Sequence, residues 1–406
     1  GHFGDAALSS GSFNFGCVNA DNLVSGLWTV PTSQFVSGGI TAYMFDNNSL
    51  INSNFGISSF SNAGYFGGGV SNAETNRTDK TIYSTDTTIA QTSANLSSIR
   101  SLLTAVSGEG TKGYFGGGTS TSSPTSQAEK LTYATATTVV QTSANLSQGR
   151  QSLAGITDKS TKGYFAGGNA GLSTVTTADK ITYSTDTTAA QTSANLSPAG
   201  IFGRSDLAGC SGEGTKGYFV GGFSEGIGAV TTTDKTTYST DTTSAQTSAN
   251  LSTATDMLAG ISNGSTTGYF AGGNTSVAEN SFVITAFKLT YSSDISSTQT
   301  TANLSQARRL LAGISNNSTQ GYFAGGETAG NSQISTADKL TFSNETTVAQ
   351  TTANISIARS SLAGVDGGNS PFEYNIVTSG KLTTTAANKI YFTNLADSSV
   401  FSGQLS

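Results

Sequence analysis

The sequence has 406 residues, of which 11% are charged and 35% hydrophobic, with 49 glycines and a formal net charge of −6. This profile, together with 14 Tyr and 21 Phe, excludes a long-helix protein and a disordered polyelectrolyte. The negative charge argues against nucleic-acid binding, and no run of 18 or more apolar residues is present that would cross a membrane as a helix.

Histidine and cysteine are too rare in this sequence for several classes of site. The one histidine, His2, stands at the start of the sequence, which argues against His-dependent catalysis and His-rich metal sites. The two cysteines, Cys17 and Cys210, are too few for a disulfide scaffold. We therefore expect no metal, no cofactor and no catalytic residue.

Residues 1–55 do not match the rest of the chain and are short for an independent domain. We expect an arm or cap that docks on the remaining domain or on a neighbouring subunit, through Trp28, Phe35 and Tyr43, with oligomers formed through this segment. The alternative is a plain closing segment, in which residues 40–45 add an outer strand to the last repeat unit.

The rest of the chain repeats with a period of about 50 residues. The string Gly-Tyr-Phe-x-Gly-Gly begins at Gly64, Gly113, Gly163, Gly217, Gly268 and Gly321. Each copy is followed by a segment such as DKITYSTDTT, then by a polar segment such as AQTSANLS, and then by a short apolar run such as SLAGI. Each unit therefore holds four candidate strands.

The residues of the four candidate strands suit different positions in a sheet. The apolar run, for example 154–156, consists of small residues and fits a crowded innermost position. In the Tyr-bearing strand, Leu131 and Tyr133 alternate with polar residues and so face one side. The glycine pair permits positive φ and close backbone approach where the second strand ends. Four such strands per 50 residues predict a β-propeller blade.

Blade counting leads to a seven-bladed ring. Six units are regular, and residues 361–406 form a seventh, degenerate unit. Residues 57–60 (ISSF) then supply the innermost strand of the first blade. The predicted fold is all-β: a seven-bladed propeller of residues 56–406, with four antiparallel strands per blade, preceded by the N-terminal arm of residues 1–55.

The order of these motifs resembles that of kelch repeats. Gly167-Gly168 stands where the kelch double glycine stands, Tyr183 stands where its tyrosine stands, and an Arg precedes the next apolar strand. Kelch blades usually carry a Trp after the Tyr, and here the polar AQTSAN segment occupies that place. The amino-acid sequences of the blades also resemble those of repeat proteins of phages and cyanobacteria. The resemblance implies the fold and leaves the activity open.

Five arginines recur in the connection between the last strand of one blade and the first strand of the next. They are Arg100, Arg150, Arg204, Arg308 and Arg359. Near a central channel they would form a cationic ring that binds a carboxylate, a phosphate or an acidic sugar. The alternative is that each Arg bonds backbone carbonyls and ties blades together. In the fifth blade, Thr255 and Asp256 stand where an Arg is expected.

The loops between the second and third strands vary most between blades, and they should lie on the same face as the arginines. Variable loops on a rigid fold are common recognition sites. Phe223 and Phe282 are their only aromatic residues, and we include both in the candidate ligand-binding set. In contrast, the Asp-Lys pair that opens the third strand recurs in most blades, which favours a structural role.

These observations favour a non-enzymatic propeller displayed on a virion or a cell surface, with a structural and recognition role, as in a phage tail. Its partners would be other subunits of an assembly, a host-surface receptor or a glycan, with no nucleic acid and no membrane insertion. The alternatives are a secreted lectin-like propeller that binds carbohydrate and an intracellular kelch-type adaptor that binds one protein partner.

Overall fold

The computed structural model describes residues 63–367, with the exception of 109, 213 and 276–280. It also describes five strands outside this range. Those strands are β1 (Ile40–Asp46), β2 (Ser49–Phe55), β35 (Leu382–Thr383), β36 (Lys389–Thr393) and β37 (Val400–Gln404). Contacts between Cα atoms divide the chain into one unit of residues 61–369 and a second of residues 1–60 with 370–406. In the second unit, β1 pairs with β2, and β36 pairs with β35 and β37, all antiparallel.

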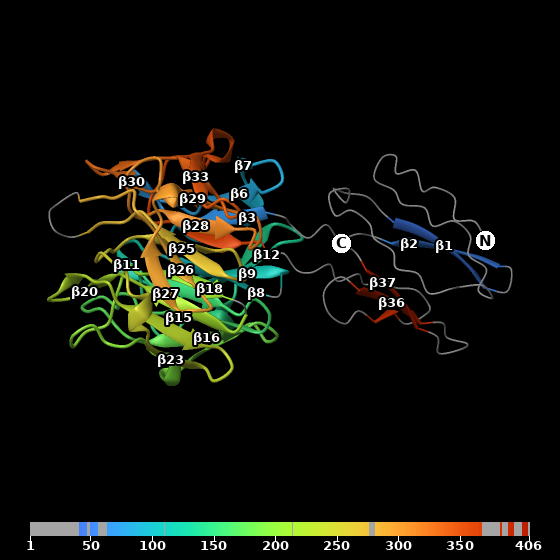
Figure 1. Ribbon diagram of the computed structural model, residues 1–406, viewed down its shortest axis with the longest axis horizontal. Coiled ribbons are helices and arrows are strands. Elements are labelled where there is room, and N and C mark those ends of the chain that lie inside the picture. Colours follow the sequence, from blue (N-terminus) through green and yellow to red (C-terminus); the bar gives the residue numbers. More distant parts are fainter. Residues whose placement is uncertain are drawn as a thin grey trace. The chain divides into compact units, whose positions relative to one another are not determined.

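In the larger unit, the described residues form six four-stranded antiparallel sheets, so the fold is an all-β propeller (Figure 1). Blade 1 contains β3 (Ala63–Gly67), β6 (Thr78–Ile82) and β7 (Thr87–Ala90), and its fourth strand comes from the end of the repeat region. Blade 2 contains β8 (Thr104–Gly108), β9 (Lys112–Gly116), β12 (Ala128–Thr132) and β13 (Thr137–Val140). Blade 3 contains β14 (Ala154–Thr157), β15 (Lys162–Ala166), β16 (Ala178–Thr182) and β17 (Thr187–Ala190). Blade 4 contains β18 (Ala208–Gly212), β19 (Lys216–Val220), β22 (Thr233–Thr237) and β23 (Thr242–Ala245). Blade 5 contains β24 (Ala259–Ser262), β25 (Thr267–Ala271), β26 (Ala286–Thr290) and β27 (Ile295–Thr298). Blade 6 contains β28 (Ala312–Ser315), β29 (Gln320–Ala324), β32 (Ala337–Thr341) and β33 (Thr346–Ala349).

The ring is closed by β34 (Ala363–Asp366), which pairs with β3 and is the innermost strand of blade 1. Neighbouring innermost strands contact one another around the ring, in the order β34, β8, β14, β18, β24, β28 and back to β34. Figure 1 shows the consequence: β3, from the start of the repeat, lies beside β28, from its end.

This closure corrects the predicted blade count from seven to six among the described residues. The apolar run expected to open a seventh blade is β34 and completes blade 1, while β36 belongs to a separate sheet. Residues 57–60, expected to be the innermost strand of blade 1, lie outside the described residues. Residues 40–45, the alternative closing strand, belong to β1, which pairs with β2.

The hydrophobic core lies between adjacent blades. The Tyr of each second strand stacks on the Tyr of the third strand in the next blade, as Tyr164 does on Tyr238 with 5.8 Å between ring centroids. Equivalent stacks recur around the ring, with Phe342 replacing the second Tyr opposite Tyr269. Both rings are buried, so the alternation predicted for the third strand directs its Tyr toward the preceding blade.

The polar AQTSAN segment also makes contacts between strands and between blades. The side-chain amide oxygen of its Asn accepts a hydrogen bond from a backbone N–H of the third strand, as Asn95 Oδ1 does from Thr78 at 2.9 Å. Its Ser or Thr hydroxyl donates to a backbone carbonyl of the next blade, as Ser93 does to Ala136 at 2.8 Å. The same two bonds recur in the other described blades. These bonds explain why the segment hardly changes along the chain.

Candidate binding face and channel mouth

The loops between second and third strands share one face with the connections between blades, as the sequence predicts. Several loops are short hairpins: β4 (Val70–Ser71) with β5 (Ala73–Glu74), β10 (Thr119–Ser120) with β11 (Ser123–Pro124), β20 (Phe223–Ser224) with β21 (Gly228–Ala229), and β30 (Glu327–Thr328) with β31 (Ser332–Gln333). A backbone bridge joins each loop to the connection beside it: Ser101 to Thr119, Gln151 to Asn169, Ser205 to Phe223, Asp256 to Asn274, Arg309 to Glu327 and Ser360 to Val70. We call this surface the loop face.

The five predicted arginines do not form an accessible ring on the loop face. The side chains of Arg100, Arg150, Arg204, Arg308 and Arg359 are fully buried. Each guanidinium pairs with a buried carboxylate that opens a third strand, over 2.5 to 2.8 Å: Glu129, Asp179, Asp234, Asp338 and Asp79, respectively. Burial lowers the pKa of each guanidinium, and the paired carboxylate opposes that shift. The ligand-binding assignment of these arginines is therefore replaced by a structural one.

Each of these arginines ties two blades together, and Arg204 shows how. Its backbone carbonyl accepts the N–H of Gly168 in blade 3 at 2.8 Å. Its side chain reaches into blade 4, where Nη1 donates to the carbonyls of Gly221 and Thr232 at 2.6 and 2.7 Å, and Nη2 lies 2.5 Å from Asp234. The glycine pair is needed here because a Cβ on Gly168, where φ is +96°, would lie 2.6 Å from a backbone oxygen.

In the fifth blade, both members of the pair are replaced together. Thr255 stands in place of the Arg, and Phe287 stands in place of the acid that opens the third strand. Both residues are buried. Replacing one member alone would leave an unpaired charge in the interior, which is strongly unfavourable.

The Asp-Lys pairs have the structural role that their recurrence predicts. The Asp is the partner of the buried Arg, and the Lys reaches the turn of the next blade, as Lys180 does to Asp241 at 2.7 Å. Lys162 lies 2.6 Å from the same carboxylate, and the Tyr164 hydroxyl donates to it. Burial alone would raise the pKa of Asp241, but the hydrogen bonds from both lysines and Tyr164 hold it well below its usual range.

A closed ring of backbone hydrogen bonds surrounds the channel at the loop face. It is made by the residue just before each innermost apolar run, which has φ between 53° and 58° in every described blade. Each N–H donates to the carbonyl of the equivalent residue in the preceding blade, over 2.7 to 2.9 Å. The residues are Leu102, Ser152, Asp206, Met257, Leu310 and Ser361. Non-glycine residues rarely adopt this conformation, so the ring imposes it.

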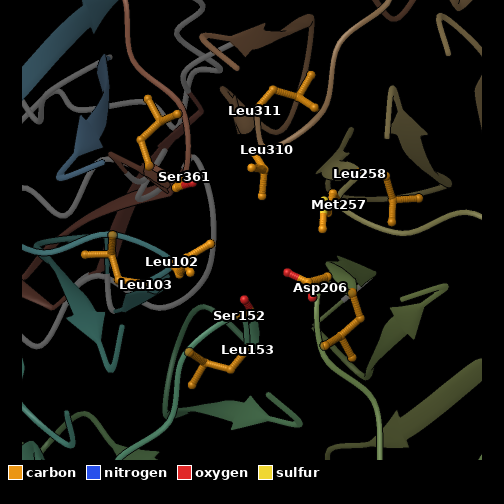
Figure 2. A pocket seen from close by; sticks show the side chains of 12 residues that line it. Leu102, Leu103, Ser152, Leu153, Asp206, Met257, Leu258, Leu310, Leu311 and Ser361 are labelled. Atoms are coloured by element: carbon orange, nitrogen blue, oxygen red, sulfur yellow. The ribbon is translucent and has the colours of Figure 1, made fainter. Parts of the chain in front are cut away.

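The side chains of these six residues line an open cavity of about 80 Å³, which we call the channel mouth (Figure 2). The leucine that follows each of them completes the lining: Leu103, Leu153, Leu207, Leu258, Leu311 and Leu362. Among the described lining residues, Asp206 is the one charged side chain. Sequence reasoning missed this site, although the run Arg-x-x-Leu before five of the six innermost strands marks where it lies.

Two carboxyl groups near the channel mouth have raised pKa values. Burial raises the pKa of Asp206. Burial, and then the charge of Asp206, raise the pKa of Asp256 to about 6. Asp256 occupies the position next to the ring in blade 5, and its side chain is only 2% exposed. Perturbed carboxyl groups at a cavity mark a candidate site.

The two predicted aromatic residues, Phe223 and Phe282, both lie half-buried on the loop face. Phe223 bridges the connection before blade 4 through its backbone. The ring of Phe282 is covered by the guanidinium of Arg309, 4.5 Å from the ring centroid, and Arg309 also pairs with Glu327 at 2.8 Å. Phe282 therefore contacts a cation of its own chain.

Three exposed aliphatic side chains on the loop face were missed by sequence reasoning. Leu172, Ile201 and Ile227 are 96%, 88% and 57% exposed. Ile201 lies in the longest connection between blades, whose residues bond the flanking loops: the carbonyl of Ala199 accepts from Ser224 at 2.9 Å, and that of Gly203 accepts from Thr174 at 3.0 Å. The signal in the sequence was the repeat spacing, which is largest at this connection.

The predicted assembly residues fall outside the larger unit. Trp28 and Phe35 lie outside the described residues. Tyr43 belongs to β1, where it pairs with Asn52 of β2.

Comparison with known proteins does not assign this chain to a family. No protein-family model matches the sequence, and no curated protein matches it. Within the described part of the chain, no helix is long and apolar enough to cross a membrane. The same residues contain no group of three or more His, Cys, Asp or Glu side chains placed to hold a metal ion. What can be stated of the class is that the chain contains a β-propeller.

Proposed function

We propose that this protein is a non-enzymatic recognition and structural component displayed on a virion or a cell surface, and that it binds its partner through the loop face. The observation that carries the proposal is the contrast within one chain between nearly constant strands and variable loops. The strands and the AQTSAN segments are constant because they form the contacts between blades. The loops lie outside these stacks and hydrogen bonds, and they differ in length and sequence between blades.

The side chains of Leu172, Ile201 and Ile227 are exposed on the loop face, which is a second argument that this face contacts the partner. Exposed aliphatic residues gathered on neighbouring loops are typical of protein interaction sites. A partner protein is therefore favoured here over a glycan, since glycan sites usually offer uncovered aromatic rings and Phe282 is covered by Arg309.

The first experiment is to locate the protein in native material by light scattering and by electron microscopy with antibodies against the loop face. Antibody label on the surface of a large particle is the expected result. A free monomer in solution would contradict surface display. If such a monomer bound glycans on an array, the lectin-like alternative would replace this proposal.

A competition experiment then tests the loop face itself. Purified protein should compete with the native particles for attachment to host cells. A Leu172→Ser/Ile201→Ser variant should need about a tenfold higher concentration or more, because central apolar contacts dominate binding free energy. Val348→Ser is the matched control, since Val348 is 55% exposed but lies on β33, an outermost strand. Equal loss in both variants would contradict the assignment of the loop face.

A further inference from the structure

One residue breaks the regularity of the channel mouth. The ring position is Leu, Ser, Met, Leu or Ser in five of the described blades, and Asp206 in blade 4. Figure 2 shows the Asp206 carboxylate directed into the opening, between Met257 and Ser152. A carboxylate at this position contributes nothing to the backbone ring, because the ring bonds are made by main-chain atoms.

The Asp206 carboxylate forms no ion pair among the described residues, although the charge of Arg309 acts on it from a greater distance and the Ser152 hydroxyl hydrogen-bonds to it. Oδ2 accepts a hydrogen bond from the Ser205 hydroxyl at 2.8 Å. No Lys or Arg side chain in the described part of the protein lies within ion-pair distance of it. This differs from the other buried carboxylates of the propeller, such as Asp234, which pair with arginine.

A second carboxylate increases the local excess of negative charge. Asp256 is 2% exposed, and its Oδ1 accepts no hydrogen bond from the described residues. Its connection is tied to that of Asp206 through the N–H of Met257, which donates to the Asp206 carbonyl at 2.7 Å. A buried carboxylate oxygen without a partner is unfavourable unless a cation offsets it.

The rest of the lining sets the chemistry of the ligand. Leu102, Met257 and Leu310 form apolar walls, and the hydroxyl groups of Ser152 and Ser361 lie at the rim. A primary ammonium offers three donors, which suit one carboxylate and two hydroxyl groups, and its alkyl stem suits the apolar walls. The lining contains no aromatic ring of the kind that recognises quaternary ammonium groups.

We propose that the channel mouth binds a primary ammonium group carried on a short apolar stem, with Asp206 as its counter-ion. The ammonium comes from a free alkylamine or from a lysine side chain of a bound protein. This inference goes beyond the proposed recognition role and can fail or hold independently of it, because binding of a free amine requires no partner protein.

Isothermal titration calorimetry on the full chain at neutral pH tests the proposal with two probes, pentylamine and Nα-acetyl-lysine methylamide. Both should bind, while their uncharged counterparts, pentanol and Nα-acetyl-norleucine methylamide, should not. Binding of pentylamine alone would assign the site to free amines, and binding of both would include lysine side chains. No heat from either amine up to about 10 mM would overturn the proposal, as would equal binding of pentanol.

Three variants test whether Asp206 is responsible for the binding. Asp206→Asn should weaken amine binding about tenfold or more, and Asn tolerates the positive φ of this position. Glu225→Gln, the same loss of charge in the loop between β20 and β21, should change nothing. Ser152→Asp should tighten binding several-fold by adding a second carboxylate to the rim, a gain that misfolding cannot produce. Unchanged affinity in Asp206→Asn would overturn the proposal.

The pH dependence gives an independent readout. The charged groups that face Asp206 from the neighbouring connections are Asp256 and Arg309. Burial raises the pKa of Asp206, and alkylamines stay protonated below about pH 10. Amine affinity should therefore fall as the pH is lowered and Asp206 takes up a proton, at a higher pH than for an ordinary Asp. Affinity that is constant down to pH 4 would contradict the role of Asp206.

Discussion

At the scale of single residues, the buried arginine–carboxylate pairs are the connections between blades that the chain repeats most faithfully. Each pair removes two charges from water, which is costly, and recovers this through the ion pair and one to three hydrogen bonds from the guanidinium to backbone carbonyls. The fifth blade shows the other stable solution, since Thr255 and Phe287 remove both charges together. One chain thus contains a natural comparison between a charged and an uncharged version of the same contact.

This comparison predicts a double-mutant cycle in blade 4. Arg204→Thr leaves Asp234 buried and unpaired, and it should destabilise the protein by about 3–5 kcal/mol. Asp234→Phe leaves Arg204 unpaired and should have a similar effect. The double variant, which copies blade 5, should recover most of the loss. Urea unfolding of the four proteins at one pH measures the coupling.

The control for this cycle is Lys180→Met, which removes a partly exposed lysine from an ion pair between blades and should change stability by less than about 1 kcal/mol. If the double variant were as unstable as the worse single variant, the pairs would not be exchangeable units.

The sequence located these arginines correctly but did not reveal their burial. Arg204 and Asp234 are far apart in the sequence, and only the curvature of the blade brings them together. Recurrence in nearly every blade did favour a structural role for the Asp-Lys pairs, and the same argument applies to the arginines. The joint loss of Arg and Asp in blade 5 was the stronger signal.

At the scale of the strands, the sequence predicts most of what the structure shows. The alternation in 130–133 and the small residues in 154–156 both place strands correctly, because burial on one or both faces fixes the side-chain pattern. The positive φ values of Leu102, Met257 and Leu310 could not be predicted, since these residues disfavour that conformation. The closed ring of backbone hydrogen bonds imposes the positive φ, and no local sequence pattern predicts such a ring.

The glycine pair yields a prediction about the ends of strands. Gly168 and Gly171 both have positive φ, but a Cβ at 168 meets the Gln151 carbonyl oxygen at 2.6 Å, and a Cβ at 171 meets nothing within 4 Å. Gly171→Ala should therefore cost only the conformational strain, about 1–2 kcal/mol. Gly168→Ala should destabilise clearly more, because the backbone of blade 3 must also move. Thermal unfolding of the two variants measures the difference, and equal melting temperatures would contradict the close approach.

At the scale of the whole molecule, the blade count is where sequence reasoning failed. Six Gly-Tyr-Phe strands and six apolar runs from 103 onward were visible, so six complete blades were available. The sequence pattern predicts an innermost strand at 57–60 for the first blade, so that the last apolar run begins a seventh blade. The pairing of β34 with β3 joins residues about 300 positions apart, and sequence patterns carry no information on such a pairing.

The closure predicts how shortened chains will behave. A chain that ends at Asn369 keeps β34 and should unfold cooperatively near the melting temperature of the full chain, because the larger unit comprises residues 61–369. A chain that ends at Arg359 loses β34, which removes the pairing partner of β3 and, with Ser361, two bonds of the backbone ring. In a closed ring each blade is supported on both sides, so opening one junction should destabilise the whole domain. Calorimetry of the two chains tests this, and a synthetic peptide of residues 360–369 should partly restore the shorter one. Equal melting of both chains would mean that β34 does not close the ring.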